Sequence, residues 1–249
     1  MSDTGTSYKR VLLKLSGEVL KGNADTGIEA AAVEKLAARL GAIRREDLQL
    51  ALVIGAGNIF RGLAASEAGM KRNTADQMGM MATIINALAV QDALEATGIR
   101  VRIQTPYPLP GVGDPFDARR AGDHLTDGTV LIFAGGTGHP YFTTDTTAAL
   151  RACEIGADAI LKATKVNGVY SDDPAVNTQA VRYRTLSYDD ALRQRLKVMD
   201  STAFSLCMDN DIPIVVFNYA DPASLHNVLQ GNMTAATLVG YEATATARD

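Results

Sequence analysis

Short apolar runs rich in β-branched residues alternate with longer alanine-rich segments along nearly the whole chain. The short runs predict strands, and the longer segments have the length and composition of helices. Strands that alternate with helices are typical of parallel strands joined by crossover helices. The sequence therefore predicts an α/β fold, although it leaves the order of the strands in the sheet open.

The predicted elements cover most of the chain. The predicted strands are residues 10–15, 48–54, 100–104, 130–134, 159–162, 213–217 and 237–240, the last of them at an edge of the sheet. The predicted helices are residues 29–45, 76–97, 116–125, 144–155, 201–209 and 222–229. Asp76 and the segment Thr143 to Thr146 are expected to cap two of these helices, because their side-chain oxygens can accept hydrogen bonds from free amide groups.

No linker, repeat or low-complexity segment divides the chain, so we expect residues 1–249 to form a single domain, with flexible termini at about 1–8 and 242–249. A net charge of −4 lacks the basic excess that binding to a nucleic-acid backbone needs. The N-terminal residues lack the apolar core of a secretory signal, and no apolar run is long enough to cross a membrane. These features predict a cytoplasmic protein that binds neither nucleic acid nor membrane.

Four segments could carry chemistry, and each follows a predicted strand. In the first, Lys14 precedes a turn of small residues, Ser16-Gly17, whose amides could face a phosphate. In the second, Gly55-Ala56-Gly57-Asn58 is followed by Arg61. Glycine allows a phosphate to approach the backbone closely, and arginine can bind phosphate oxygens in a fork. Ordinary turns have the same composition, so each segment taken alone keeps a purely structural interpretation.

The second segment also resembles a truncated dinucleotide-binding fingerprint. Phe60 stands where the third glycine of that fingerprint is required. Asp76 lies at a predicted helix start, whereas the fingerprint needs an acidic residue at the end of a strand. A dinucleotide site is therefore the weaker interpretation.

The other two segments also combine polar and small residues. Residues 134–150 (AGGTGHPYFTTDTTAAL) offer glycine amides, hydroxyls and a helix start to a bound anion. Residues 160–174 (ILKATKVNGVYSDDP) continue from Lys162 with a threonine, an aromatic residue and an acidic residue. A capped loop and a plain Asn167-Gly168 turn are the structural alternatives. His139 lacks acidic or cysteine partners at metal-ligand spacing, so no protein-bound metal is expected.

Open α/β sheets bind their ligands at the carboxyl ends of the strands, which all four segments follow. The segments could therefore form one cleft. No GxxxxGK[ST] motif occurs in the chain, so a site for phosphate transfer would not be a P-loop site.

Five segments, KLSGE, VIGAGNIFRG, ADQMGM, GTGHPYFTTD and KATKVNGVYSDDP, occur in the order found in bacterial uridine monophosphate kinases. The chain resembles this family, a branch of the amino acid kinase superfamily, from about residue 8 to residue 241. The resemblance implies a three-layer αβα sandwich around a mainly parallel sheet of about eight strands, assembled as a homohexamer. It also implies ATP-dependent phosphorylation of UMP to UDP in pyrimidine nucleotide synthesis.

On matching positions, the resemblance implies three groups of site residues. The ATP-binding residues would be Lys14, Leu15, Ser16, Gly17, Gly57, Arg61, Thr164, Tyr170 and Asp173. The UMP-binding residues would be Ala56, Asp76, Thr137, Gly138, His139, Pro140, Tyr141, Phe142, Thr143 and Thr144. The catalytic residues would be Lys14, Lys162 and Asp145, with Asp145 orienting the two lysines.

Three positions depart from the family pattern. Ala56 stands where glycine is common, Asn167 where aspartate is common and His139 where asparagine is frequent. Only a methyl group is added at Ala56, so backbone contacts would survive there.

The resemblance also implies allosteric regulation, with UTP as an inhibitor and GTP as an activator. The effector site of the family uses basic side chains near residues 89–102 and the strand that begins at residue 130. Arg102 is present, whereas Glu95 and Thr129 occupy positions where basic residues are expected. These two residues weigh against activation by GTP.

The expected reaction needs no general base, because the second pKa of a phosphate monoester is about 6 and the acceptor oxygen of UMP is already ionised. Catalysis would come from positioning and charge stabilisation, with Mg²⁺ carried mainly by the ATP phosphates. An amino acid or carbamate kinase and a non-catalytic nucleotide-binding or oxyanion-storage protein remain alternatives. The ADQMGM and FTTD segments favour a nucleotide acceptor, and both lysines together with Asp145 favour an enzyme.

Overall fold

The computed structural model describes residues 8–196 and 199–247. Its strands are β1 (Arg10–Leu15), β2 (Gln49–Ile54), β3 (Val101–Thr105), β4 (Asp114–Pro115), β5 (Val130–Phe133), β6 (Ala159–Thr164), β7 (Tyr183–Ser187), β8 (Ile214–Asn218), β9 (Ala236–Gly240) and β10 (Ala245–Thr246). They form one ten-stranded sheet in the order β10-β7-β9-β8-β6-β1-β2-β5-β3-β4. Neighbouring strands are parallel except in the pairs β8–β9 and β7–β10.

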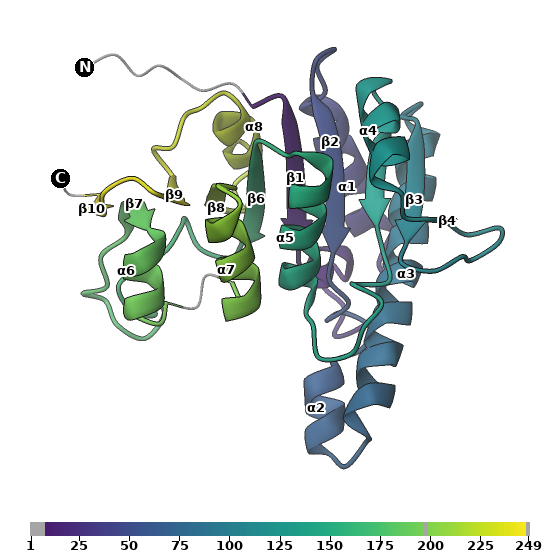
Figure 1. Cartoon of the computed structure of the whole chain (residues 1–249), viewed down its shortest axis with the longest axis horizontal. Helices are drawn as coiled ribbons and strands as arrows, with labels where there is room; N and C mark the ends of the chain where they lie inside the picture. The colour runs from purple at the N-terminus through teal and green to yellow at the C-terminus, as the bar shows by residue number, and fades with distance from the viewer. Residues whose placement is uncertain (1–7, 197–198, 248–249) are drawn as a thin grey trace.

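Helices cover both faces of this sheet (Figure 1). They are η1 (Gly17–Leu20, a 3₁₀ turn), α1 (Ala30–Ala42), α2 (Gly62–Glu67), α3 (Arg72–Ala96), α4 (Ala118–Thr126), α5 (Thr144–Ile155), α6 (Tyr188–Arg193), α7 (Ser201–Asp209) and α8 (Ser224–Leu229). Apolar residues of α1, α3 and α8 pack on one face, and those of α4, α5, α6 and α7 pack on the other. The expected α/β sandwich is confirmed.

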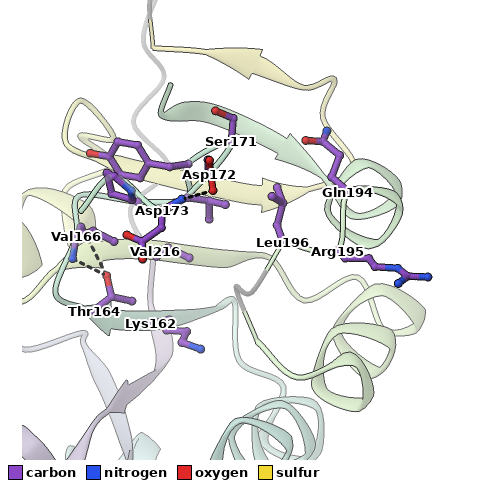
Figure 2. A pocket seen from close by; sticks show the side chains of 14 residues that line it. Lys162, Thr164, Val166, Ser171, Asp172, Asp173, Gln194, Arg195, Leu196 and Val216 are labelled. Atoms are coloured by element: carbon purple, nitrogen blue, oxygen red, sulfur yellow. Dashed lines mark hydrogen bonds between the residues drawn. The ribbon is translucent and has the colours of Figure 1, made fainter. Parts of the chain in front are cut away.

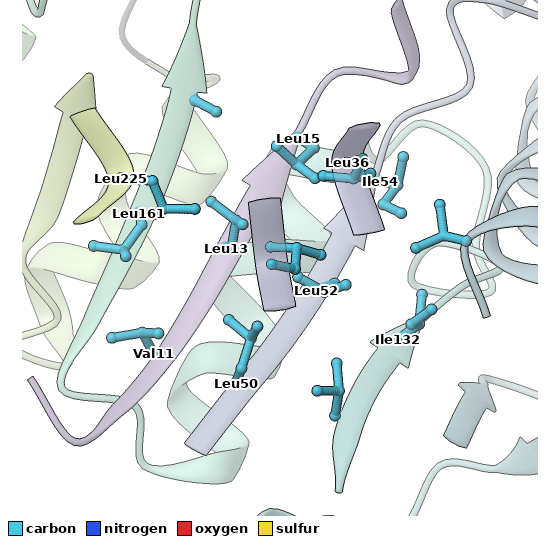
Figure 3. Close-up of a cluster of buried hydrophobic side chains, with 14 of the residues drawn as sticks. Val11, Leu13, Leu15, Leu36, Leu50, Leu52, Ile54, Ile132, Leu161 and Leu225 are labelled. Atoms are coloured by element: carbon cyan, nitrogen blue, oxygen red, sulfur yellow. The ribbon is translucent and has the colours of Figure 1, made fainter. Parts of the chain in front are cut away.

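The core explains why the central strands read as continuous apolar runs. Strand β1 is buried on both faces, so Leu13 and Leu15 enter one hydrophobic cluster and Leu12 the other. Figure 3 shows the first cluster, in which Leu36 of α1 lies beside Leu15 of β1 and Ile54 of β2. Burial of these large side chains supplies the main driving force for folding of the sheet.

All seven predicted strands are confirmed, but the predicted place of residues 237–240 at an edge is wrong. Strand β9 lies between β8 and β7 because a further strand, at residues 183–187, pairs beyond it. Strands β4, β7 and β10 and the short helices η1, α2 and α6 were not predicted. They are short and only partly buried, so their sequences lack a strong apolar period.

One of the two predicted helix caps is wrong. Helix α3 begins at Arg72 with Lys71 as its N-cap, so Asp76 lies inside the helix. The polar residues 72–74 were predicted to lie in a loop because their side chains do not pack into the core and give no apolar period. The other cap is confirmed, since the side chain of Thr143 accepts from the amides of Asp145 and Thr146 at 3.0 and 3.3 Å.

Parts of the expected flexible termini pack against the sheet. Tyr8 is buried, and residues 245–246 pair with β7. Residues 1–7 and 248–249 lie outside the described residues. Among the helices that the structure describes, none combines the length and apolar character that crossing a membrane requires.

Candidate active site

The four polar segments meet at one edge of the sheet. They follow β1, β2, β5 and β6, which are consecutive in the order β6-β1-β2-β5. These strands are mutually parallel, so their carboxyl ends lie at the same edge. Helix α2 and the start of α3 project beyond this edge (Figure 1). The predicted cleft between distant segments therefore has a structural basis.

Two lysines and one carboxylate occupy the middle of this edge. Lys14 of β1 is in register with Lys162 of β6, so both side chains leave the same face of the sheet. Lys14 Nζ lies 2.5 Å from Asp145 Oδ1, and Lys162 Nζ lies 2.7 Å from Asp145 Oδ2. All three side chains are between 12% and 16% exposed. A single carboxylate thus holds two ammonium groups side by side.

The surroundings of Asp145 shift the pKa values of this group. Burial opposes ionisation of Asp145, but the ammonium groups of Lys14 and Lys162 outweigh it, so the pKa of Asp145 lies below its usual value. Burial lowers the pKa of Lys162, and the like charge of Lys14 lowers it further, while attraction to Asp145 opposes both effects. Asp145 also lies in the first turn of α5, where the helix dipole favours a negative charge.

The turns after β1 and β2 are in close contact. A Cβ at Gly17 would lie 2.3 Å from the carbonyl oxygen of Gly55 and 2.2 Å from Asn58 Oδ1, so only glycine fits there. Asn58 and Asn86 exchange two side-chain hydrogen bonds of 2.9 and 2.8 Å, and Asn86 also donates to the carbonyl of Gly55 at 2.8 Å. This buried amide network fixes the turn that precedes Gly57, and the sequence offered no signal for it.

A second charged cluster lies beside these turns. Glu18 of η1 pairs with Arg61, which follows β2, and with Lys165, which follows β6, each at 2.6 Å. The neighbouring Ser16 accepts from the amide of Glu18 and caps η1. Lys165 lies within the fourth polar segment, residues 160–174, but neither Lys165 nor Glu18 was predicted as a site residue.

Helix α3 holds the loop between β5 and α5. Asp76 Oδ2 accepts from the amide of Tyr141 at 2.7 Å, and Thr83 Oγ1 accepts from the amide of Gly135 at 2.8 Å. Tyr141 has a φ of 73°, which is strained for a non-glycine residue. Arg72, which pairs with Asp76 at 2.7 Å, lies over the ring of Tyr141 at 5.2 Å. Strain at such a position is frequent in ligand-binding loops.

Asp200 connects the start of α5 to the start of α7. Its carboxylate accepts from the hydroxyls of Thr143 and Thr146 at 2.5 and 3.0 Å, and from the amide of Ala203 at 2.9 Å. Asp200 was not predicted as a site residue or as a helix cap. A recognisable signal was present, because an acidic residue directly before a helical segment is a typical N-cap.

A cavity of about 560 Å³ opens beside Lys162 (Figure 2). Thr164, Tyr170 and Asp173 line it together with the apolar side chains Val216 and Leu196. The structure therefore brings the predicted residues after β6 to one concave surface that borders the lysine pair. Its mixture of apolar and polar walls is typical of a small-molecule site.

The remaining predicted residues differ in exposure. Leu15 is fully buried, so only its backbone could contact a ligand. Tyr141 and Phe142 are 65% and 49% exposed. Thr137, His139 and Phe142 line a separate cavity of about 420 Å³ that reaches α5 and α7.

Of the positions expected at the effector site, Arg102 lies in β3, Glu95 in α3 and Thr129 directly before β5. Arg102 of β3 lines a cavity of about 470 Å³ with Gln91 and the loop 108–115. Within residues 8–196 and 199–247, no group of three or more His, Cys, Asp or Glu side chains could hold a metal ion. Asp145, the carboxylate that contacts both lysines, is already shared by two ammonium groups. Any metal in the reaction would thus fit better on substrate phosphates than on protein ligands.

Comparison with known proteins gives consistent relatives. The family described as the amino acid kinase family matches residues 9–218. A UMP kinase from Bacillus anthracis shares 38% identity with a TM-score of 0.91, over 96% of this chain and 98% of that one. A UMP kinase from Ureaplasma parvum shares 38% identity with a TM-score of 0.87, over 93% and 98% of the two chains. A uridylate kinase from Archaeoglobus fulgidus shares 27% identity with a TM-score of 0.69, over 92% and 99%.

Proposed function

Because the chain belongs to the amino acid kinase family, we propose that it transfers the γ-phosphoryl group of ATP to UMP and forms UDP and ADP. The observation that carries this proposal is the pair of ammonium groups that share Asp145 where the four strand ends meet. Two anionic substrates repel each other, and two fixed cations between them reduce that repulsion.

The mechanism needs charge stabilisation more than proton transfer. The acceptor oxygen of UMP is ionised at neutral pH, so it can attack the γ-phosphorus in line without a base. Lys14 and Lys162 would neutralise the equatorial oxygens of the transferring group. Asp145 would hold the two ammonium groups in place and keep their mutual repulsion low.

ATP would occupy the side of the site that β1, β2 and β6 form. The cavity beside Lys162 would take the adenosine, with Thr164, Tyr170 and Asp173 as contacts. The backbone of residues 14–17 and Gly57, together with the side chain of Arg61, would contact the phosphates. Mg²⁺ would arrive on these phosphates and supply further charge neutralisation.

UMP would bind between α3 and the loop that ends at α5. Asp76 uses Oδ2 for Tyr141 and Arg72, which leaves Oδ1 to accept from ribose hydroxyls. Main-chain groups of the loop 137–144 would pair with the edge of the uracil ring, and Ala56 would contribute its backbone. Hydrogen bonds to a base edge reject wrong bases strongly, because a mismatch leaves polar groups unpaired.

Consumption of ATP in the presence of candidate acceptors tests the proposal. We expect ADP formation with UMP and much less with other nucleoside monophosphates, carbamate or acylated amino acids. Turnover of carbamate or an acylated amino acid in place of UMP would instead indicate another member of the family. Tight nucleotide binding without any turnover would indicate a non-catalytic binding protein.

Lys162→Met tests the charge role. We expect kcat to fall by at least ~100-fold with a smaller change in KM, because a preorganised charge that acts mainly in the transition state is lost. Lys35→Met, at an exposed position of α1, is the matched control and should keep wild-type kcat. Near-wild-type turnover of Lys162→Met would contradict the mechanism.

We also propose a homohexamer built from one domain per chain, acting in the cytoplasm in pyrimidine nucleotide synthesis. Helix α3 supports an assembly, since Met78, Met81, Ile85 and Leu88 form a stripe on it and are 40% to 50% exposed.

UTP is a candidate inhibitor because it carries the uracil that the acceptor site would bind. GTP is the weaker candidate effector, since Glu95 and Thr129 replace expected basic residues near Arg102.

A further inference from the structure

Glu18 places a negative charge where the proposed substrates also bring negative charge. Its carboxylate oxygens contact two different cations: Oε1 lies 2.6 Å from Arg61 Nη2, and Oε2 lies 2.6 Å from Lys165 Nζ. The side chain of Glu18 is 21% exposed, whereas those of Arg61 and Lys165 are 64% and 85% exposed. One largely buried anion therefore holds two exposed cations over the ends of β2 and β6.

The backbone around Glu18 is packed against a neighbouring turn, whereas the two cations are on long, exposed side chains. Glu18 lies in η1, whose first residue, Gly17, packs directly on the turn at Gly55. Arg61 has one other contact of note, a long hydrogen bond of 3.3 Å to the carbonyl of Gly57. The guanidinium and ammonium groups can thus move toward a ligand more readily than the carboxylate can.

The cluster belongs to the same edge as the lysine pair. Glu18 follows Lys14 by four residues along the turn after β1, and Lys165 follows Lys162 by three residues after β6. The turn that carries Glu18 packs on the turn at Gly55. A nucleotide whose phosphates extended from the lysine pair along these turns would bring oxygens to Arg61 and Lys165. Those oxygens would compete with the carboxylate of Glu18 for the same two cations.

Building on the function proposed above, we propose that Glu18 is a displaceable counter-ion for nucleotide phosphates. It holds Arg61 and Lys165 over the empty site and releases them to phosphate oxygens when nucleotide binds. A phosphate carries more negative charge than a carboxylate and matches the guanidinium fork, so the exchange is favourable. Glu18 remains in η1 after the exchange and repels the bound phosphates, which lowers nucleotide affinity and promotes product release.

The opposite role makes the opposite prediction. If Glu18 served to arrange Arg61 and Lys165 for binding, loss of its charge would weaken the binding of nucleotide. If Glu18 is a counter-ion, loss of its charge strengthens binding. The sign of the change in affinity therefore decides between the two roles.

The first measurement is the Kd of ADP for wild type and Glu18→Gln by titration calorimetry. We expect a Kd about three- to tenfold lower in the variant, the size that two exposed ion pairs support. The difference should shrink as salt is raised, because screening weakens charge interactions at this exposed site. Glu34→Gln, an exposed position of α1, is the matched control and should leave the Kd unchanged.

The second measurement asks whether Glu18 acts through its two partners. In an Arg61→Gln/Lys165→Gln background, Glu18→Gln should lose most of its effect on the Kd, because the cations that it occupies are gone. Glu18→Ala in both backgrounds repeats the comparison if the glutamine forms new hydrogen bonds. A Kd for ADP in Glu18→Gln that equals or exceeds the wild-type Kd would overturn the counter-ion role. So would an equally large decrease in Kd when Glu18→Gln is added to the Arg61→Gln/Lys165→Gln background.

These outcomes are separate from a failure of the proposed function. If the wild-type protein binds ADP but consumes no ATP with UMP, the phosphoryl-transfer proposal fails, and the Kd comparison still decides the role of Glu18. If the wild-type protein binds no ADP, both proposals fail.

Discussion

Two lysines held by one carboxylate would give this site its sensitivity to charge. Lys14 and Lys162 are like charges in partly desolvated surroundings, which is unfavourable unless an anion lies between them. Asp145 supplies that anion in the free protein. A phosphoryl group would add further negative charge and stabilise both ammonium ions. The same residues therefore account for the stability of the free site and for its proposed affinity for phosphate.

The lowered pKa of Lys162 predicts an early loss of activity at alkaline pH. Lys162 is protonated below its pKa, which lies under the usual 10.5, so its charge is lost sooner than that of an ordinary lysine as pH rises. In Lys162→Arg the charge persists, and we expect a lower kcat whose alkaline decline moves to higher pH. Profiles of kcat against pH for wild type, Lys162→Arg and the exposed control Lys35→Arg test this. Identical alkaline limbs in the first two would rule out Lys162 as the titrating group.

Asp76→Asn tests contact with the ribose. Loss of a charged acceptor should lower kcat/KM for UMP by about 10- to 100-fold, the range for a hydrogen bond to a charged group. The loss for dUMP should be smaller if the 2′-hydroxyl is one of the donors. Asp92→Asn, at an exposed position on the same helix, should change neither value. Equal losses of kcat/KM for UMP and dUMP would show that Asp76 does not accept a hydrogen bond from the 2′-hydroxyl.

At the level of elements, the starts of α5 and α7 are joined through one side chain. Asp200 caps α7 and binds Thr143 and Thr146 at the start of α5. Helix α5 carries Asp145, so the position of the proposed catalytic carboxylate depends on a helix 55 residues further along the chain.

Asp200→Ala should therefore lower the stability of the protein by more than the loss of an ordinary helix cap does. We expect the free energy of unfolding to fall by about 2–3 kcal/mol, from the lost cap and the hydroxyl donors left unpaired, and kcat to fall as well. Asp117→Ala removes the N-cap of α4, a helix that carries none of the predicted site residues, and should lower the free energy of unfolding by less, with kcat unchanged. Urea unfolding and steady-state kinetics on both variants make the comparison. Equal stability losses and equal kcat values would show that Asp200 is only a cap.

In the whole molecule, helix α3 presents two different faces. Its buried face packs on the sheet and holds the loop before α5, while its other face exposes an apolar stripe. An exposed stripe on a helix that holds a binding loop would couple assembly to the geometry of the site. The proposed homohexamer would bury that stripe.

Ile85→Glu tests this use of the stripe, since Ile85 is 50% exposed at its centre. A charge there should split the assembly into smaller species, which light scattering after size exclusion would detect. Val176→Glu adds the same charge at an 84% exposed position in the loop between β6 and β7 and should leave the mass unchanged. A wild-type protein that is already monomeric would contradict the assembly proposal.

Elements that depend on local interactions could be predicted from the amino-acid sequence. Long apolar runs predicted the central strands, and the bounds of α5 and α7 agree with the structure because each has a clear cap and a continuous apolar pattern. Residue types at strand ends also indicated where phosphate chemistry could occur. Short, half-exposed elements such as β7 and α6 escaped prediction, since few of their residues enter the core.

Contacts between distant side chains could not be predicted in this way, because they depend on how the whole chain packs. The contact of Lys14 and Lys162 with Asp145 depends on β6 lying next to β1, and strand order follows from packing of the whole sheet. The pairs that involve Glu18 and Asp200 likewise join residues more than 40 positions apart. Such contacts leave no periodic trace along the chain, because the free energy that selects them is summed over the entire core.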